Sequence, residues 1–263
     1  MTCNLRVLGC SGGISSDLRT TSLLLNDNIL IDAGTGVGDL SLEELRKIDH
    51  VFLTHSHLDH LCSVPFIADA VGGSRHQPLK IYGIYETIHA LQEHIFNNVI
   101  WPDFTKIPTL ERPFIRLELI EIDQAIKLGD LTITALPVDH SISANAYAIN
   151  SGNGTLVFSG DTGVSDALWQ AINRQINLKH LILETSFLNS EEELANVSGH
   201  LSPALLISEL KKLQPTTYHP ELCIWVCHLK PDGGDAIMAE IEAAARELAI
   251  KPQKLTRNTV LSF

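Results

Sequence analysis

The sequence of 263 residues has no run of 18 apolar residues, so no transmembrane helix is expected. Its N-terminus passes from Met1 directly into the strand-like residues 5–8, without the basic region and apolar core of a signal peptide. Its five cysteines have no paired spacing, which favours reduced thiols over a disulfide framework. We therefore expect a cytoplasmic protein that does not bind membranes.

Basic residues are also scarce. The 19 Lys and Arg residues face 31 Asp and Glu residues, which gives a net charge of −12. A protein that binds long nucleic acid through its phosphates usually has a basic face, and no such face is expected here. A small anionic substrate, such as a nucleotide, remains compatible because bound metal ions would reverse the local field.

The apolar pattern predicts strands followed by helices, twice, with no linker between the two halves. This order is typical of an α/β protein with two sheets packed face to face and helices outside, a four-layer αββα sandwich in one domain, residues 1–263. Strands are expected at 4–9, 21–26, 28–33, 50–54, 79–83, 115–121, 131–137, 144–150, 155–159, 180–184, 222–227 and 258–262, and helices at 41–47, 59–71, 86–96, 165–173, 203–213 and 234–248.

Residues 97–114 are irregular and rich in proline and aromatic residues. We expect a cap or inserted loop here, over the site or over a partner. Trp101 and Phe104 within it suit either stacking on a nucleobase or anchoring of the loop and contact with a second subunit.

Residues 55–60, His-Ser-His-Leu-Asp-His, are rich in side chains that bind metal ions. They directly follow the apolar residues 50–54, which predict a buried strand, so they are expected on a loop at the rim of a sheet. Zinc binds imidazole and carboxylate groups, and catalytic zinc sites leave one position open for water. The predicted ligands in this segment are His55, His57, Asp59 and His60.

Four more polar residues each lie just past an apolar strand, in the same pattern. Each alone is more often a surface residue, but side chains at strand ends on one rim can converge on one point. These residues are His140, Asp161, Glu184 and His228.

Taken in order, these motifs resemble those of the metallo-β-lactamase superfamily along almost the whole chain. The resemblance implies the αββα fold of that superfamily and a site for two divalent ions. Zinc suits a His-rich site, while Mn²⁺ or iron can occupy the same ligands. By this resemblance the first ion is bound by His55, His57 and His140, the second by Asp59, His60 and His228, and Asp161 bridges them.

Two segments, 55–63 and 94–102, are similar to class II 3′,5′-cyclic-nucleotide phosphodiesterases. Two others, 184–187 (Glu-Thr-Ser-Phe) and 199–202 (Gly-His-Leu-Ser), resemble the phosphodiesterase side of the superfamily more widely, including tRNase Z. The resemblance implies hydrolysis of cAMP or cGMP to the 5′-monophosphate by a metal-bridged hydroxide. It also implies that His200 is the general acid, that Glu184 orients it, and that the enzyme is a homodimer.

Asp59 could accept the proton of the attacking water as well as bind metal. The alternative for His200 is a structural role at the entry to the helix that Ser202 and Pro203 predict.

Three other functions stay open. A tRNase Z-like endonuclease needs a basic arm for tRNA, and the charges within residues 97–114 cancel. A thioester or lactone hydrolase of the same fold would leave Glu184 and His200 without an obvious role. A metal-binding protein without catalysis would be expected to lack at least one ligand, and all seven positions are filled.

Overall fold

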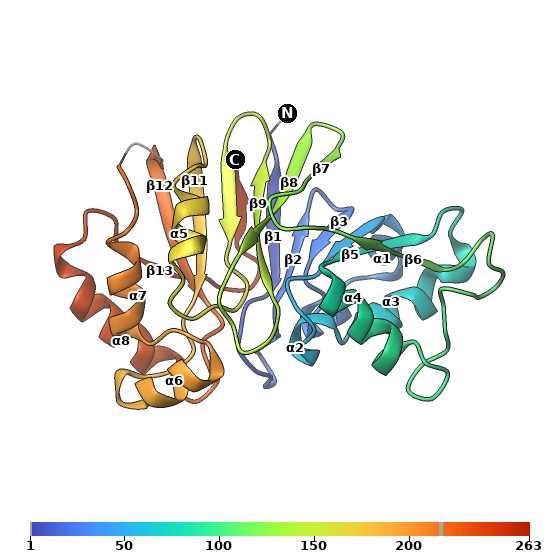
Figure 1. Ribbon diagram of the computed structural model, residues 1–263, viewed down its shortest axis with the longest axis horizontal. Coiled ribbons are helices and arrows are strands. Elements are labelled where there is room, and N and C mark those ends of the chain that lie inside the picture. Colours follow the sequence, from blue (N-terminus) through green and yellow to red (C-terminus); the bar gives the residue numbers. More distant parts are fainter. Residues whose placement is uncertain (1, 216–217) are drawn as a thin grey trace.

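Two seven-stranded sheets form the centre of the molecule (Figure 1). The computed structural model describes residues 2–215 and 218–263, so Met1, Thr216 and Thr217 of the predicted domain 1–263 lie outside the described residues. The first sheet has the order β14 (Val260–Ser262), β1 (Asn4–Gly9), β2 (Ser22–Leu25), β3 (Ile29–Ile31), β4 (His50–Phe52), β5 (Leu79–Gly83) and β6 (Ile115–Leu119). The second has the order β13 (Gln253–Lys254), β12 (Tyr218–Cys227), β11 (Leu178–Glu184), β10 (Thr155–Phe158), β9 (Asn145–Asn150), β8 (Leu131–Pro137) and β7 (Ala125–Leu128).

Each sheet is antiparallel in one part and parallel in the other. Strands β1 to β3 and β7 to β10 pair antiparallel, whereas β3 to β6 and β10 to β13 pair parallel. The parallel strands need helical crossovers, which place helices on the outer face of each sheet. These are α1 (Leu42–Lys47), α2 (Leu58–Leu61), α3 (Val64–Val71) and α4 (Tyr85–Ala90) in the first half, and α5 (Asp166–Ile172), α6 (Glu192–Ser198), α7 (Pro203–Leu210) and α8 (Gly234–Ala244) in the second.

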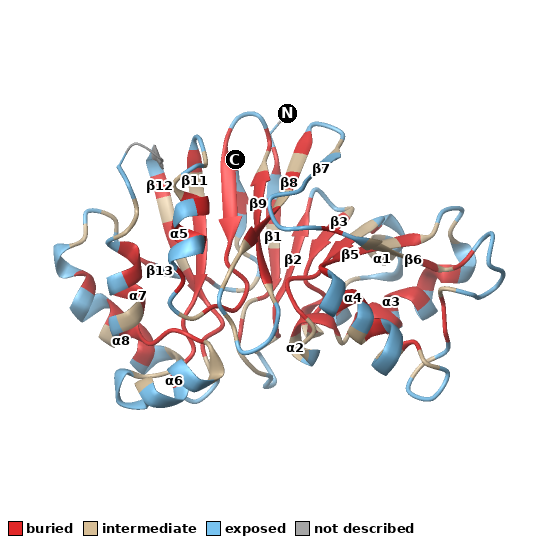
Figure 2. Cartoon of the chain, viewed as in Figure 1, coloured by how far each residue is buried: buried red, intermediate tan, exposed pale blue. Residues whose placement is uncertain are grey.

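Alternate residues of a strand point into different layers of the core. On β4, Phe52 packs between the two sheets, while Val51 packs with residues of α3 and α4. On β11, Ile182 faces the other sheet and Leu181 faces the helices of the second half. This period of two confirms the predicted four-layer αββα sandwich. Figure 2 shows the result, with strands buried and helices exposed on their outer faces.

Two predicted helices are interrupted in the structure, and those expected at 203–213 and 234–248 end earlier, at Leu210 and Ala244. The helix expected at 59–71 is split, because Pro65 lies in the first turn of α3 and lacks the N–H that a continuous helix needs. The helix expected at 86–96 ends as α4 at Ala90 and continues as a π-helical turn over Leu91–Ile95.

Three further elements lie where neither helix nor strand is expected, and one of them is the exposed two-residue edge strand β13. Helix α6 buries only Ala195, so its sequence has no apolar periodicity. Strand β7 is a short edge strand whose residues are exposed or half-buried, so its sequence has no buried face to detect.

Residues 97–114 lie at one end of the molecule, beside α3 and α4 (Figure 1). Phe104 is buried with its ring against Phe96 and Phe114, at centroid distances of 6.3 and 5.3 Å. Trp101 packs edge-on against Phe66 at 5.3 Å. Of the two roles considered for Phe104, the structure therefore supports the anchor, because its buried ring has no free face for a base. No helix among the described residues is long and apolar enough to cross a membrane.

Candidate dinuclear metal site

The predicted site residues lie at one edge of the sandwich. Strands β10, β11 and β12 are parallel, so their carboxyl ends meet, and Asp161, Glu184 and His228 follow or end these strands. Strand β8 runs the same way as β10, because β9 is antiparallel to both, and His140 follows it. The loop after β4 brings residues 55–60 to the same edge. Helix α2 begins directly after His57 of this loop, and Figure 1 shows it low in the view, between the two halves.

The structure brings all seven predicted ligands together in two adjacent groups. In each group the candidate ligand atoms lie within 4.8 Å of one another. The first group contains His55, His57, His140 and Asp161, and the second contains Asp59, His60 and His228. The division is the one that the sequence resemblance implies for two ions.

Asp161 lies between the two groups. Its Oδ2 is 3.7 Å from His55 Nε2 in the first group. It is 3.3 Å from both His60 Nε2 and His228 Nε2 in the second. One buried carboxylate oxygen therefore faces the ligand nitrogens of both groups, which is the position a bridging ligand needs.

Hydrogen bonds turn the ligand nitrogen of two buried histidines inward. His60 Nδ1 donates to Asp32 Oδ2 at 2.7 Å, and a carboxylate only accepts, so the proton is on Nδ1. The Thr54 hydroxyl donates to Asp32 Oδ2 at 2.9 Å and accepts from His55 Nδ1 at 3.0 Å. The Nε2 atoms of His55 and His60 are buried and have no hydrogen-bond partner among the described residues. In the neutral form of each ring, the Nε2 lone pair is directed at the site, as a metal ligand requires.

The other histidines are oriented by the second half of the chain. His140 Nδ1 donates to the carbonyl of Gly199 at 2.8 Å, and its Nε2 faces His57 Nδ1 at 3.3 Å. His228 Nδ1 donates to Ser186 Oγ at 2.9 Å, while its Nε2 lies 3.3 Å from Asp59 Oδ2. Four imidazoles therefore present Nε2, whereas His57 presents Nδ1.

The electrostatics of the pocket favour neutral imidazoles next to charged carboxylates. Burial lowers the pKa values of His55, His57 and His140, so these rings are neutral and can donate a lone pair. Burial opposes ionisation of Asp59 and Asp161, but the neighbouring histidines outweigh it and hold both pKa values below their usual range. The donor set of neutral imidazoles and carboxylates fits divalent zinc, manganese or iron.

His60 behaves differently from the other histidines. Burial alone would lower its pKa, but the carboxylates of Asp161 and Asp32 outweigh burial and raise it well above the usual 6.5. A positive charge is therefore favoured between these two buried carboxylates. A divalent cation that displaces this proton would supply positive charge beside the same carboxylates.

His200 and Glu184 form a second buried unit beside the metal ligands. His200 Nδ1 donates to Glu184 Oε1 at 2.7 Å, and Glu184 also accepts from the Thr162 backbone N–H at 3.1 Å. Burial would lower the pKa of His200, but the hydrogen bond and charge of Glu184 outweigh it and raise the pKa. The His200 ring lies 5.0 Å from that of His140, between centroids. A nitrogen of His200 also lies within 4.8 Å of the ligand atoms of Asp161 and His228, so the unit faces the site.

Three buried side chains that support the site were missed from the sequence: Asp32, Thr54 and Ser186. Asp32 follows the apolar strand β3 in the same pattern as the predicted ligands, which is the signal that could have identified it. Ser186 Oγ lies within hydrogen-bond distance of His228, Glu184 and His200, at 2.9, 3.1 and 3.3 Å. It thereby links a predicted metal ligand to the predicted catalytic pair.

Unusual backbone conformations occur at these strand ends. Asp32 has φ of 56° and His228 has φ of 60°, a left-handed region that is uncommon for non-glycine residues but that Asp and His adopt more often than most. Gly199 has φ of 69°, and a Cβ there would lie 2.6 Å from the Ser141 nitrogen. Only glycine therefore allows the carbonyl at 199 to reach His140 Nδ1.

The chain belongs to the beta-lactamase superfamily, because the family described as beta-lactamase superfamily domain matches residues 27–220. Its fold is the metallo-beta-lactamase fold of solved structures. The crystal structure of unliganded yeast PDE1 aligns over 100% of this chain and 99% of that one, with a TM-score of 0.83 and 20% sequence identity. The predicted superfamily and fold class are thus confirmed.

Two curated relatives illustrate different names among the similar proteins. A protein of Yersinia pestis described as a "probable 3′,5′-cyclic-nucleotide phosphodiesterase" is 26% identical over 270 residues, which cover 85% of this chain and 77% of the relative. Ribonuclease Z of Clostridium acetobutylicum is 34% identical over 164 residues, which cover 54% of this chain and 48% of the relative. Both similarities support a metallo-hydrolase.

Proposed function

We propose that this protein is a metal-dependent phosphodiesterase that hydrolyses 3′,5′-cyclic nucleotides to 5′-monophosphates. The observation that carries the proposal is the fixed orientation of the histidines: each of four Nδ1–H groups is bound by the protein, so each Nε2 faces a shared pocket. Such a set of lone pairs beside two carboxylates suits a pair of divalent ions.

The proposed ligands divide between two ions, most simply zinc. One ion would be held by His55, His57 and His140, and the other by Asp59, His60 and His228. Asp161 would contribute to both sites. When bound, two such ions polarise phosphoryl oxygens and lower the pKa of a water at the site.

The remaining steps belong to side chains of this chain. As water attacks phosphorus, the P–O3′ bond breaks and the leaving 3′-oxygen needs a proton. His200 is the proposed donor, because Glu184 holds its Nδ1 and keeps the ring protonated to higher pH. Asp59, the most exposed carboxylate of the cluster with 33% of its side chain accessible, is the proposed acceptor of the proton that the attacking water loses.

Similarity to named phosphodiesterases supports the cyclic substrate, since the Yersinia relative aligns over 85% of this chain. A ribonuclease Z-like activity is the second candidate, because the clostridial ribonuclease Z has the higher identity, 34%, over a shorter stretch. The chain's net charge of −12 weighs against binding of a long RNA.

Hydrolysis assays with four substrates test the proposal: cAMP, cGMP, bis(p-nitrophenyl) phosphate and a precursor tRNA. We expect chelator-sensitive release of 5′-AMP or 5′-GMP. Cleavage of the precursor tRNA without cyclic-nucleotide hydrolysis would favour the ribonuclease candidate. Hydrolysis of the aryl diester alone would reject both substrates and leave a metallo-hydrolase.

A further inference from the structure

A groove of about 680 Å³ adjoins the candidate metal site. Three segments line it: residues 84–86 at the start of α4, residues 120–122 after β6, and residues 138–144. The last segment includes His140, whose Nε2 faces the first group of candidate ligands. His140 therefore lies at the boundary between the candidate metal site and this groove.

The groove offers an aromatic ring and apolar side chains to a ligand. Tyr85 is 63% exposed, and its ring meets His89 at an interplanar angle of 67° and a centroid distance of 5.6 Å. This edge contact does not cover the tyrosine ring as a stacked neighbour would. Ile122 and Ile142, which are 39% and 36% exposed, also line the groove. An open aromatic face beside apolar side chains suits stacking of a nucleobase.

The charged residues of the groove all carry the same sign at neutral pH. Glu86, Glu121 and Asp139 line it and are exposed, and no Lys or Arg is among its lining residues. Carboxylates accept hydrogen bonds from ribose hydroxyls and base amino groups. They repel further phosphates, so a nucleoside fits this groove and a polynucleotide does not.

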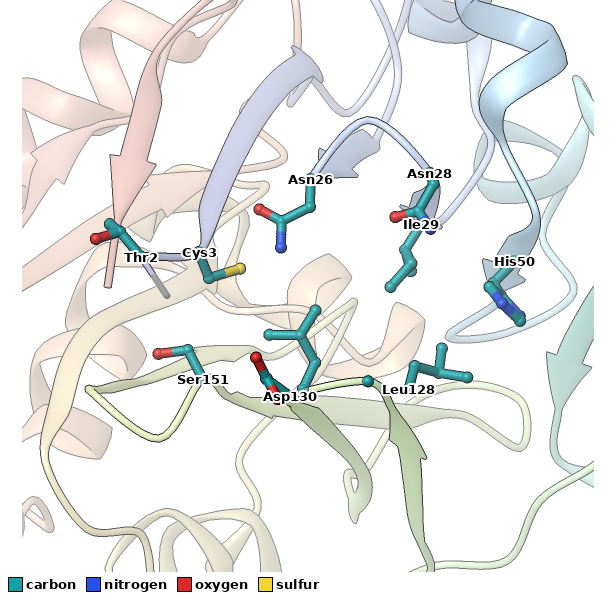
Figure 3. Close-up of a pocket in the computed structure, with 11 residues that line it drawn as sticks. Thr2, Cys3, Asn26, Asn28, Ile29, His50, Leu128, Asp130 and Ser151 are labelled. Atoms are coloured by element: carbon teal, nitrogen blue, oxygen red, sulfur yellow. The ribbon is translucent and has the colours of Figure 1, made fainter.

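The pocket shown in Figure 3 lies at the opposite edge of the sheets. It is lined by the β2–β3 and β7–β8 turns and by His50 at the start of β4, whereas the predicted ligands follow the end of β4. No member of the candidate ligand groups lines it. A substrate bound there would be separated from the candidate metal site by the length of the strands.

We propose that the groove at residues 84–86, 120–122 and 138–144 binds the nucleoside part of the substrate, with Tyr85 stacked on the base. Its carboxylates select a mononucleotide diester over RNA. This inference rests on the proposed function and deepens it, because it assigns the binding site for the nucleoside part of the cyclic nucleotide. Tyr85 is a specificity residue in this assignment, and the chemical step is left to the buried cluster.

Inhibition of aryl-diester hydrolysis tests the stacking contact, with 5′-AMP, 5′-GMP and inorganic phosphate as the three inhibitors. We expect both nucleotides to inhibit more strongly than phosphate. Tyr85→Ala should weaken nucleotide inhibition roughly tenfold relative to phosphate inhibition, and Tyr85→Phe should retain nucleotide inhibition. Phe66→Ala is the matched control, because it removes an exposed ring outside the groove and should leave nucleotide inhibition unchanged. Equal inhibition by nucleotide and phosphate, or an unchanged ratio in Tyr85→Ala, would overturn the assignment.

A second measurement addresses the carboxylates. A short RNA should inhibit the Glu86→Gln/Glu121→Gln double variant several-fold more strongly than the wild type at low salt, whereas Glu242→Gln, an exposed change on α8, should have no effect. Unchanged RNA inhibition in the double variant would refute selection by charge.

The proposed function and the groove can fail separately. If cyclic nucleotides are not hydrolysed but Tyr85 still controls mononucleotide inhibition, the groove assignment stands and the reaction is wrong. If cyclic nucleotides are hydrolysed and Tyr85→Ala leaves nucleotide inhibition intact, the reaction stands and the groove assignment is wrong.

Discussion

Replacement of Asp32 by asparagine should weaken metal binding without direct contact with the ion. The Asp32 carboxylate accepts from Thr54 N at 2.8 Å, from Thr54 Oγ1 at 2.9 Å and from His60 Nδ1 at 2.7 Å, and it is fully buried. Asparagine has one acceptor oxygen, so its NH₂ group must face Thr54 or His60. The backbone need not change, because asparagine tolerates the φ of 56° at this position.

Both orientations of the asparagine amide carry a cost. If the NH₂ group faces Thr54, a buried N–H loses its acceptor, which costs about 1–3 kcal/mol of folding free energy. If it faces His60, that ring must accept at Nδ1 and move its proton to Nε2, the atom turned toward Asp161. Loss of such a support typically lowers metal affinity by roughly 10- to 100-fold, equivalent to about 1.4–2.7 kcal/mol.

Competition with a chromogenic chelator would measure the affinity for zinc in the wild type and in Asp32→Asn. Thermal unfolding of the metal-free protein would report the cost to the fold. Asp130→Asn makes the same change of charge at an exposed position of the pocket in Figure 3, and should alter neither value. Wild-type affinity for both ions in Asp32→Asn would show that the tautomer of His60 does not depend on this carboxylate.

Four further predictions concern the remaining parts of the site. His200→Ala should keep its metal content and lose roughly 10²–10⁴-fold in kcat, and unchanged turnover would remove it from the mechanism. Asp161→Ala should lose metal as well as activity, and elemental analysis that finds both ions would reject it as the bridge. The activity that requires protonated His200 falls as the pH rises through the raised pKa of His200. Because Glu184 raises that pKa, a pH–rate profile of Glu184→Gln should show this fall in activity at lower pH. Ser186→Ala should lower both zinc affinity and kcat by about tenfold or more, because it removes the hydroxyl that contacts His228 and Glu184. Ser186→Thr keeps a hydroxyl and should restore both values. Equal behaviour of the two variants would show that the hydroxyl at 186 is not required.

Much of the architecture could be predicted from local patterns. The alternation of apolar residues identified most strands, because each buries one face or both and the period of two is visible in the sequence. Each predicted ligand is a His or Asp that follows such a strand, and parallel strands end at one edge, so Asp161 and His228 were expected to converge. Helix α6 and strands β7 and β13 were missed because none of them buries a periodic apolar face.

Tertiary contacts decided the details on which the chemistry depends. Which nitrogen of an imidazole faces the site is set by a partner distant in the chain, such as Asp32 for His60, 28 residues away, and Ser186 for His228, 42 residues away. No local pattern records these pairs, because hydrogen bonds depend on the position of atoms in space and on the burial of the groups that form them. The groove at Tyr85 likewise exists only where three separate segments meet beside His140. The sequence by itself determined which side chains could bind metal, and the tertiary structure decided how they are oriented and what lies next to them.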